Sequence, residues 1–141
     1  MNRELIYKNK ISETCYDQDN SVISYIYSGN MDRKITKVQL QAILDFLEDK
    51  TVYGIYLDIQ YLMGSFSKLL EYMNKDYYPF MLNHGLHCKV IVVSKDLITS
   101  HLSKLLYDIL SDLGINARVF KNPTETKKWL EEVLAKRIPS E

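Results

Sequence analysis

Two short segments of this chain are apolar at nearly every position, and they constrain the fold more than any other feature. Residues 52 to 59 read VYGIYLDI, and residues 89 to 94 read KVIVVS. A strand with one solvated face alternates apolar and polar residues, whereas a strand covered on both faces is almost continuously apolar. Both segments are therefore predicted to be central strands of a sheet that helices cover on its two sides.

Segments with the spacing of amphipathic helices separate the predicted strands. An apolar stripe runs through residues 35 to 48, a second helix is predicted to start near Ser65, and a third covers residues 102 to 113. Residues 122 to 125 read Asn-Pro-Thr-Glu, which is typical of the start of a fourth helix. Pro79 is expected to bend or break the second helix, because proline has no amide hydrogen and clashes with the preceding turn.

Three strand-like segments precede the first helix. Residues 5 to 7 are apolar, residues 11 to 16 alternate, and residues 21 to 28 are rich in β-branched and aromatic side chains. The turn-forming residues 17 to 20 separate the second segment from the third. A last strand is predicted over residues 117 to 120, so the second half of the chain alternates helix and strand, as parallel crossovers do.

We therefore predict an α/β fold with a single-layer mixed sheet, mostly parallel with an antiparallel N-terminal hairpin, packed with about four helices. The chain has 141 residues, of which 46% are hydrophobic and 26% are charged. These values are typical of one globular domain. The prediction is a single domain over residues 1–141 with a core from about residue 4 to residue 134.

Charge and hydropathy argue against two classes of partner. Lysine and arginine number 18, aspartate and glutamate number 18, and the formal net charge is zero. Nucleic-acid binders usually carry a basic excess, so no nucleic-acid partner is predicted. A net charge of zero removes the repulsion between copies and favours a homodimer. The chain has neither an N-terminal signal peptide nor an apolar run of about 20 residues, so we expect a cytoplasmic protein without a membrane span.

Cysteine and histidine are too sparse to predict a metal site. Cys15 and Cys88 lie 73 positions apart in predicted strands and are expected to be small apolar core residues. His84 and His87 are neighbours of Cys88, but a second cluster of ligands that would complete a metal site is missing. Accordingly, no metal and no cofactor are predicted.

The layout resembles the STAS superfamily of sulphate transporters and anti-sigma-factor antagonists, and most closely a standalone bacterial branch of it. The features that carry the resemblance are LDI at 57–59, YMNKDYYPFMLNHGL at 72–86, the strand at 89–94 and ARVFKNPTETKKWL at 117–130. The resemblance covers most of the chain, from about residue 4 to residue 134. It implies a non-enzymatic module that binds a protein partner or a ligand.

The same resemblance points to a phosphorylatable serine. Anti-sigma antagonists carry this serine at a helix start that follows a strand ending in aspartate. Here the aspartate is Asp58, and Ser65 falls near the acceptor position. The chain departs from the family pattern in having Gly64 in place of the acidic residue before the serine, in lacking the glycine after it, and in a loop about two residues shorter. Ser65 is also suited to be simply the N-cap of the second helix.

The prediction for function is a non-enzymatic bacterial module, with a regulatory role, that binds an unknown protein partner or small ligand. Its site is placed where α/β sheets usually bind ligands, at the carboxyl ends of the strands. The candidate residues there are Asp58, Tyr61, Gly64 and Ser65. The chain contains no G-x-S-x-G, P-loop, G-x-G-x-x-G or H-E-x-x-H motif that would point to an enzyme.

Two alternatives stay open. One is a phosphoacceptor switch, either at Ser65 or at Asp58 as the acceptor of a receiver-like site. The other is a module for lipid or another small apolar ligand, in which the aromatic residues from Tyr72 to Phe80 open a pocket around Pro79. Ordinary core packing under a bent helix is the preferred interpretation of these aromatic residues. Tyr25 and Tyr27 are expected to cover a half-exposed face of the sheet.

Overall fold

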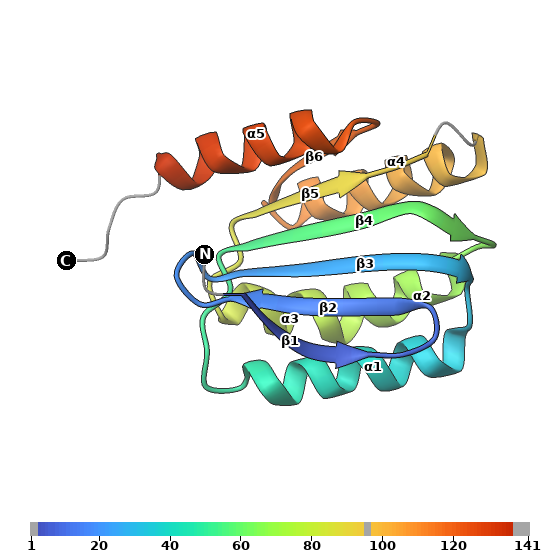
Figure 1. Cartoon of the computed structure of the whole chain (residues 1–141), viewed down its shortest axis with the longest axis horizontal. Helices are drawn as coiled ribbons and strands as arrows, with labels where there is room; N and C mark the ends of the chain where they lie inside the picture. Colours follow the sequence, from blue (N-terminus) through green and yellow to red (C-terminus); the bar gives the residue numbers. More distant parts are fainter. Residues whose placement is uncertain (1–2, 95–96, 137–141) are drawn as a thin grey trace.

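The computed structural model describes residues 3–94 and 97–136, with the backbone alone over residues 97–103. Six strands form one sheet in the order in which they occur along the chain (Figure 1). The first three strands pair antiparallel, and the third to the sixth pair parallel. The strands are β1 (Arg3–Lys8), β2 (Ser12–Asp17), β3 (Val22–Asn30), β4 (Gly54–Met63), β5 (Cys88–Val92) and β6 (Asn116–Phe120).

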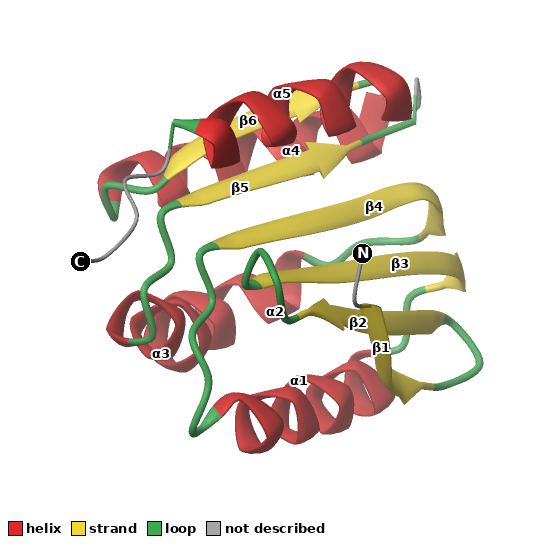
Figure 2. Ribbon diagram, turned by 60° about the vertical axis from the view of Figure 1, so that its left-hand side comes forward, coloured by secondary structure: helices red, strands yellow, loops and turns green. Residues whose placement is uncertain are grey.

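Helices cover the two faces of the sheet unequally, as Figures 1 and 2 show. One face carries a large core beneath α1, the α2 to α3 segment and α4, while the other carries a smaller core beneath α5 alone. This arrangement confirms the predicted α/β fold with a mixed sheet. The helical elements are α1 (Arg33–Leu47), α2 (Ser67–Tyr72), a π-helical turn (Met73–Tyr77), α3 (Tyr78–Asn83), α4 (Leu97–Asp112) and α5 (Pro123–Ala135).

Strand β4 is longer than its sequence pattern indicates. The apolar segment predicts an end near residue 59, but the strand continues to Met63. The extension pairs with β3, with Ser28 opposite Tyr61 and Asn30 opposite Met63, after an irregularity in the register. The predicted end was wrong because the added ladder bonds come from a strand that is distant in sequence.

The prediction that Tyr25 and Tyr27 cover a half-exposed sheet face was also wrong. Both side chains are buried, and both belong to the large core. Alternate residues of a strand point to opposite faces, so these tyrosines share a face with Ile23 and lie under the helices. The intervening residue Ile26 points to the other face, where it is 40% exposed.

Pro79 changes the second helical segment in an unexpected way. Instead of a simple bend or break, five residues before α3 form a π-helical turn, in which the amide of Tyr78 donates to the carbonyl oxygen of Met73. Proline then occupies the first turn of α3, where its missing amide hydrogen is tolerated. The wider turn keeps the helical path continuous and brings two consecutive tyrosines, Tyr77 and Tyr78, into the core.

None of the helices in the described ranges combines the length and the apolar character that crossing a bilayer requires.

Candidate functional site

The four residues predicted as a site do not form one cluster. Asp58 lies in the middle of β4, and its carboxylate accepts hydrogen bonds from the backbone and side-chain amides of Gln60, at 3.0 Å and 3.1 Å. Tyr61 points into solvent, with 69% of its surface exposed. Five residues of extended strand, roughly 16 Å, separate Asp58 from the end of β4. The longer strand thus keeps Asp58 away from the loop that carries the other candidates.

Gly64 and Ser65 lie in that loop, between β4 and α2. Gly64 has a φ of +88°, a conformation that glycine adopts without the strain other residues incur. The hydroxyl of Ser65 donates to the hydroxyl of Ser67 at 2.9 Å and accepts from the amide of Ser67 at 3.2 Å. Helix α2 begins at Ser67, and Phe66 occupies the N-cap position, so Ser65 is not the cap.

Among the described side chains, the cysteines and histidines form no candidate metal centre. Cys15 and Cys88 do not form a disulfide, and only Cys88 is fully buried. Within residues 3–94 and the described side chains of 104–136, no three histidine, cysteine, aspartate or glutamate side chains gather closely enough to hold a metal ion.

The most unusual residue of the large core is Lys89, the second residue of β5. Its side chain is only 2% exposed and faces the helices, like Ile91 two residues later. The ammonium nitrogen Nζ donates a hydrogen bond of 2.5 Å to the hydroxyl of Tyr78 and lies 4.9 Å from the centre of the same ring. Lysine is almost never fully buried without a charged partner, so this position calls for an explanation.

Buried tyrosines surround the lysine. The hydroxyls of Tyr25 and Tyr77 share a hydrogen bond of 2.5 Å, and the ring of Tyr77 meets that of Tyr78 edge-on with centroids 5.1 Å apart. The rings of Tyr25 and Tyr27 stack at 6.4 Å. We call the four tyrosines together with Lys89 the lysine–tyrosine cluster.

The cluster continues through neutral groups toward β2. The hydroxyl of Tyr27 donates to the side-chain oxygen of Gln39 at 2.8 Å, and the side-chain nitrogen of Gln39 donates to the hydroxyl of Thr14 at 2.9 Å. Both Gln39 and Thr14 are fully buried. Each of these polar groups therefore has a partner inside the core, which removes the cost of burying it unpaired.

Burial shifts the acid–base equilibria of the cluster toward uncharged forms. Desolvation lowers the pKa of Lys89 to about 7. Desolvation also raises the pKa values of Tyr25, Tyr77 and Tyr78 well above the usual value for tyrosine. Low-dielectric surroundings disfavour the ammonium and the phenolates alike. At neutral pH the cluster thus combines neutral phenols with a lysine that is about half deprotonated.

A cavity of about 40 Å³ lies beside the cluster. Its walls come from β3, β4, β5, α1, α2, the π-helical turn and α4, and its accessible lining is apolar. Tyr25, Tyr27, Tyr77 and Lys89 all border it. The aromatic segment from Tyr72 to Phe80 thus contributes both to core packing and to the wall of a cavity, through Tyr77.

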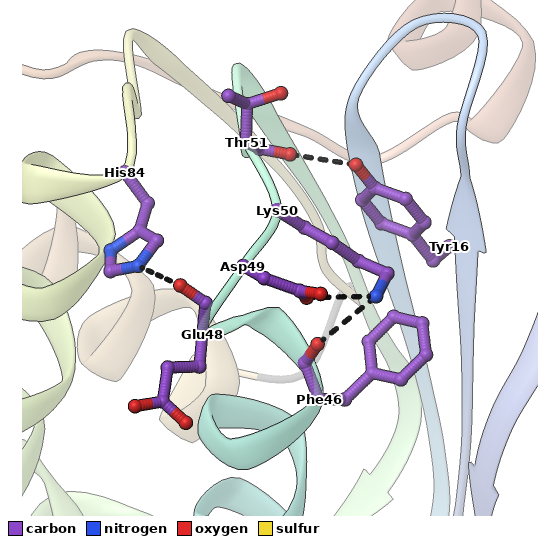
Figure 3. A network of polar contacts seen from close by, with 7 residues as sticks. All are labelled: Tyr16, Phe46, Glu48, Asp49, Lys50, Thr51 and His84. Atoms are coloured by element: carbon purple, nitrogen blue, oxygen red, sulfur yellow. Dashed lines mark hydrogen bonds and ion pairs between the residues drawn. The ribbon is translucent and has the colours of Figure 1, made fainter.

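A second polar network lies at the loop between α1 and β4 (Figure 3). The ring nitrogens of His84 lie 3.2 Å from the carbonyl oxygen of Glu48 and 2.8 Å from that of Phe80. The Tyr16 hydroxyl donates to the carbonyl oxygen of Thr51 at 2.8 Å. These bonds tie the loop to α3 and to β2, and every one of them ends on backbone. In the same loop, Lys50 pairs with Asp49 at 3.1 Å and lies over the ring of Phe46. We call all these residues together the loop network.

The sequence patterns did not single out Lys89. The four consecutive β-branched residues of KVIVVS predict a buried strand, and Lys89 is the first residue of that segment. One signal was present, because Lys89 and Ile91 share the parity that places them on one face. The packing of the sheet decides which of its faces carries the large core. The shared parity therefore does not show, without the structure, that Lys89 lies in that core.

Comparisons with protein-family models, with curated proteins and with solved structures find no match to this chain.

Proposed function

We propose that this chain is a non-catalytic module that binds a small apolar ligand in the cavity beside the lysine–tyrosine cluster. The single observation that carries the proposal is an apolar cavity that a buried lysine and three tyrosines border. Ligand sites are typically apolar concavities with a few placed polar groups. Of the functions considered from the sequence, binding of a small apolar ligand agrees best with this geometry.

The cavity volume sets the size of the ligand. About 40 Å³ holds roughly three water-sized groups, which corresponds to a molecule of a few non-hydrogen atoms. A lipid acyl chain is much longer than the cavity and would need a rearrangement of α2 and the π-helical turn. Since π-helical turns are frequent at functional sites, the turn that supplies Tyr77 is the element we expect to adapt to a ligand.

The experiment that tests this proposal is two-dimensional NMR of the labelled protein during titration with 1-propanol. Binding in the cavity should shift the amides of the lining strands in a saturable way. Leu69→Phe should abolish these shifts, because Leu69 borders the cavity and a larger ring fills it. Leu130→Phe, the same change in the small core beneath α5, is the matched control and should leave binding intact. Unsaturable shifts spread over the surface would refute the proposal.

The wider setting belongs to the same proposal: a cytoplasmic bacterial regulatory protein of STAS-like type that acts through a protein partner or a second copy of itself. The outer face of β1 to β3 supports a partner role, since Leu5 is 53% exposed there and Ile26 40% exposed. Light scattering coupled to size-exclusion chromatography tests the homodimer directly. A monomer at all concentrations up to the millimolar range would exclude it.

Phosphorylation at Ser65 is the second candidate, and one observation favours it. The Ser65 side chain is exposed, and among the described residues it forms hydrogen bonds only with Ser67, so a kinase could reach it. Intact-mass measurement of protein purified from its host tests this alternative. A phosphate that maps to Ser65, and that Ser65→Ala removes, would support it. An unmodified mass under all growth conditions would count against it.

A further inference from the structure

The environment of the Lys89 amine leaves most of its bonding capacity unused. An ammonium group carries three donors, and among the described residues the Nζ atom has one partner, the Tyr78 hydroxyl. None of the ion pairs formed by described residues involves Lys89. Burying an ammonium group without a carboxylate partner costs a large desolvation free energy, whereas burying a neutral amine in the same place costs much less.

A neutral amine is a nucleophile, and desolvation in an apolar pocket is one way in which proteins activate lysine. An ordinary lysine is unprotonated in roughly one molecule in 2,500 at pH 7. With its pKa lowered to about 7, Lys89 is unprotonated in about half of the molecules. The titratable groups beside it are phenols: its Nζ atom contacts Tyr78 of α3, and Tyr25 and Tyr27 of β3 and Tyr77 of the π-helical turn line the same cavity.

Two features of the geometry indicate what kind of compound the amine would hold. Lys89 is one of the residues that line the cavity, and the accessible lining is apolar, so an alkyl group attached to the amine would have apolar space beside it. The Tyr78 hydroxyl lies 2.5 Å from the same nitrogen and can pass protons to and from groups bound there.

We propose that the ligand of this module is a small aldehyde or ketone, which Lys89 holds covalently as an imine. The inference rests on the proposed function, because it names the ligand class of the same cavity. The Nζ lone pair adds to the carbonyl carbon, and one proton passes from the nitrogen to the carbonyl oxygen to give a neutral carbinolamine. Tyr78 donates a proton to the departing hydroxyl group and recovers one from nitrogen. One water leaves, a C=N double bond forms, and no oxidant or reductant is needed.

The carbonyl compound reaches the amine through transient local opening of the core, which small domains undergo. Its alkyl part then occupies the apolar cavity, and the uncharged imine removes the penalty of a buried ammonium. The competing chemistry for the same residue is a small carboxylic acid that pairs with the ammonium without a covalent bond. Both predict a dependence on Lys89, so the test must separate them.

The experiment incubates the full chain at pH 7 with propanal and sodium cyanoborohydride, which reduces an imine to a stable secondary amine. Intact mass and peptide mapping should then show one propyl group on Lys89. Labelling should be at least tenfold faster there than at exposed lysines such as Lys8, because desolvation lowers the pKa of Lys89. Mapping also separates Lys89 from the N-terminal amine.

Two variants keep the result interpretable. Lys89→Met should lose the label, because methionine is an apolar side chain of similar length that has no amine. Tyr78→Phe keeps Lys89 in place and should label at least several-fold more slowly. Circular dichroism and thermal unfolding confirm that each variant is folded before the labelling is compared.

The outcomes are distinct for the two proposals. If 1-propanol binds but propanal labels Lys89 no faster than it labels exposed lysines, the imine is refuted and the binding module stands. If propionate shifts the lining amides in a Lys89-dependent way and propanal leaves Lys89 unlabelled, the ligand is an acid and the inference is likewise overturned. If neither propanol nor propanal engages the cavity, both proposals fail.

Discussion

The lysine–tyrosine cluster and the loop network each contain a lysine that lies over an aromatic ring, but the two lysines lie in opposite environments. Lys50 lies over the ring of Phe46 at 4.2 Å, much as Lys89 lies over the ring of Tyr78 at 4.9 Å. Lys50, however, is partly exposed, pairs with Asp49 at 3.1 Å and donates to a backbone carbonyl. Among the described residues, the only hydrogen-bond partner of the Lys89 amine is the phenol of Tyr78. Lys50 helps to hold a loop in place, whereas Lys89 is a buried amine that lines a cavity.

The difference teaches that burial, rather than residue type, sets the chemistry of these side chains. In the loop network, the charged groups are partly or largely exposed to solvent and most of the bonds end on backbone carbonyls, so the network holds the loop in place (Figure 3). In the cluster, water is excluded and the groups are driven to neutral forms. Only the second arrangement places a reactive amine next to a cavity.

The largest expected effect comes from removing a ring of the cluster. Tyr78→Ala should lower the free energy of unfolding by about 3–5 kcal/mol, because it creates a cavity and leaves the Lys89 amine without its described partner. Urea unfolding followed by circular dichroism measures this loss. A loss below about 1 kcal/mol would show that the ring is not an integral part of the core.

The second effect is a pH dependence that belongs to Lys89. Its pKa is about 7 in the folded protein and 10.5 in the unfolded chain. Between these pH values the unfolded chain binds a proton that the folded protein does not, so stability rises with pH. The free energy of unfolding should increase by about 2 kcal/mol from pH 7 to pH 9 relative to Lys89→Met. Above about pH 10 the trend reverses, because the unfolded chain releases tyrosine protons that the buried phenols retain.

The matched control for this pH effect is Lys50→Met, in the loop network. Lys50 is partly exposed and lies outside the lysine–tyrosine cluster, so the rise in stability that Lys89 causes should persist in Lys50→Met. Urea unfolding of the three proteins between pH 6 and pH 9 makes the comparison. Parallel curves for wild type and Lys89→Met would show that Lys89 keeps its proton when buried, and would remove the main support for a nucleophilic amine.

A smaller effect is expected from the hydrogen bond between Tyr25 and Tyr77. Replacing either residue by phenylalanine leaves one buried hydroxyl unpaired and should cost about 1–2 kcal/mol. The double variant removes both hydroxyls and should cost less than the sum of the two single changes. Additive losses in a double-mutant cycle would mean that the two hydroxyls do not depend on each other.

The smallest effect is expected in the loop network. Asp49→Asn removes an ion pair whose carboxylate is largely exposed, and no measurable change in the unfolding midpoint should follow. Thermal unfolding at low and high salt checks this expectation. A clear, salt-dependent loss of stability would show that the loop network contributes to the stability of the whole protein, beyond holding its own loop in place.

Much of the fold was predictable because its signals are local. Continuous apolar runs marked β4 and β5, amphipathic spacing marked the helices, and residues 122 to 125 marked the start of α5.

The candidate site was predictable only in part. The aromatic segment around Pro79 was identified as a potential pocket wall, and Tyr77 does border the cavity. Lys89 and the facing tyrosines of β3 were not identified, because single-strand patterns do not tell which face lies under which helices.

By itself, the sequence determined the alternation of strands and helices, the two-sided burial of the central strands and the interruption at Pro79. These features depend on side chains within a few residues of each other along the chain. Only the tertiary structure decided that β4 extends to Met63 along β3, and that tyrosines from β3 and the π-helical turn meet beside Lys89. Ladder pairing and desolvation depend on neighbours in space, and no local pattern contains them.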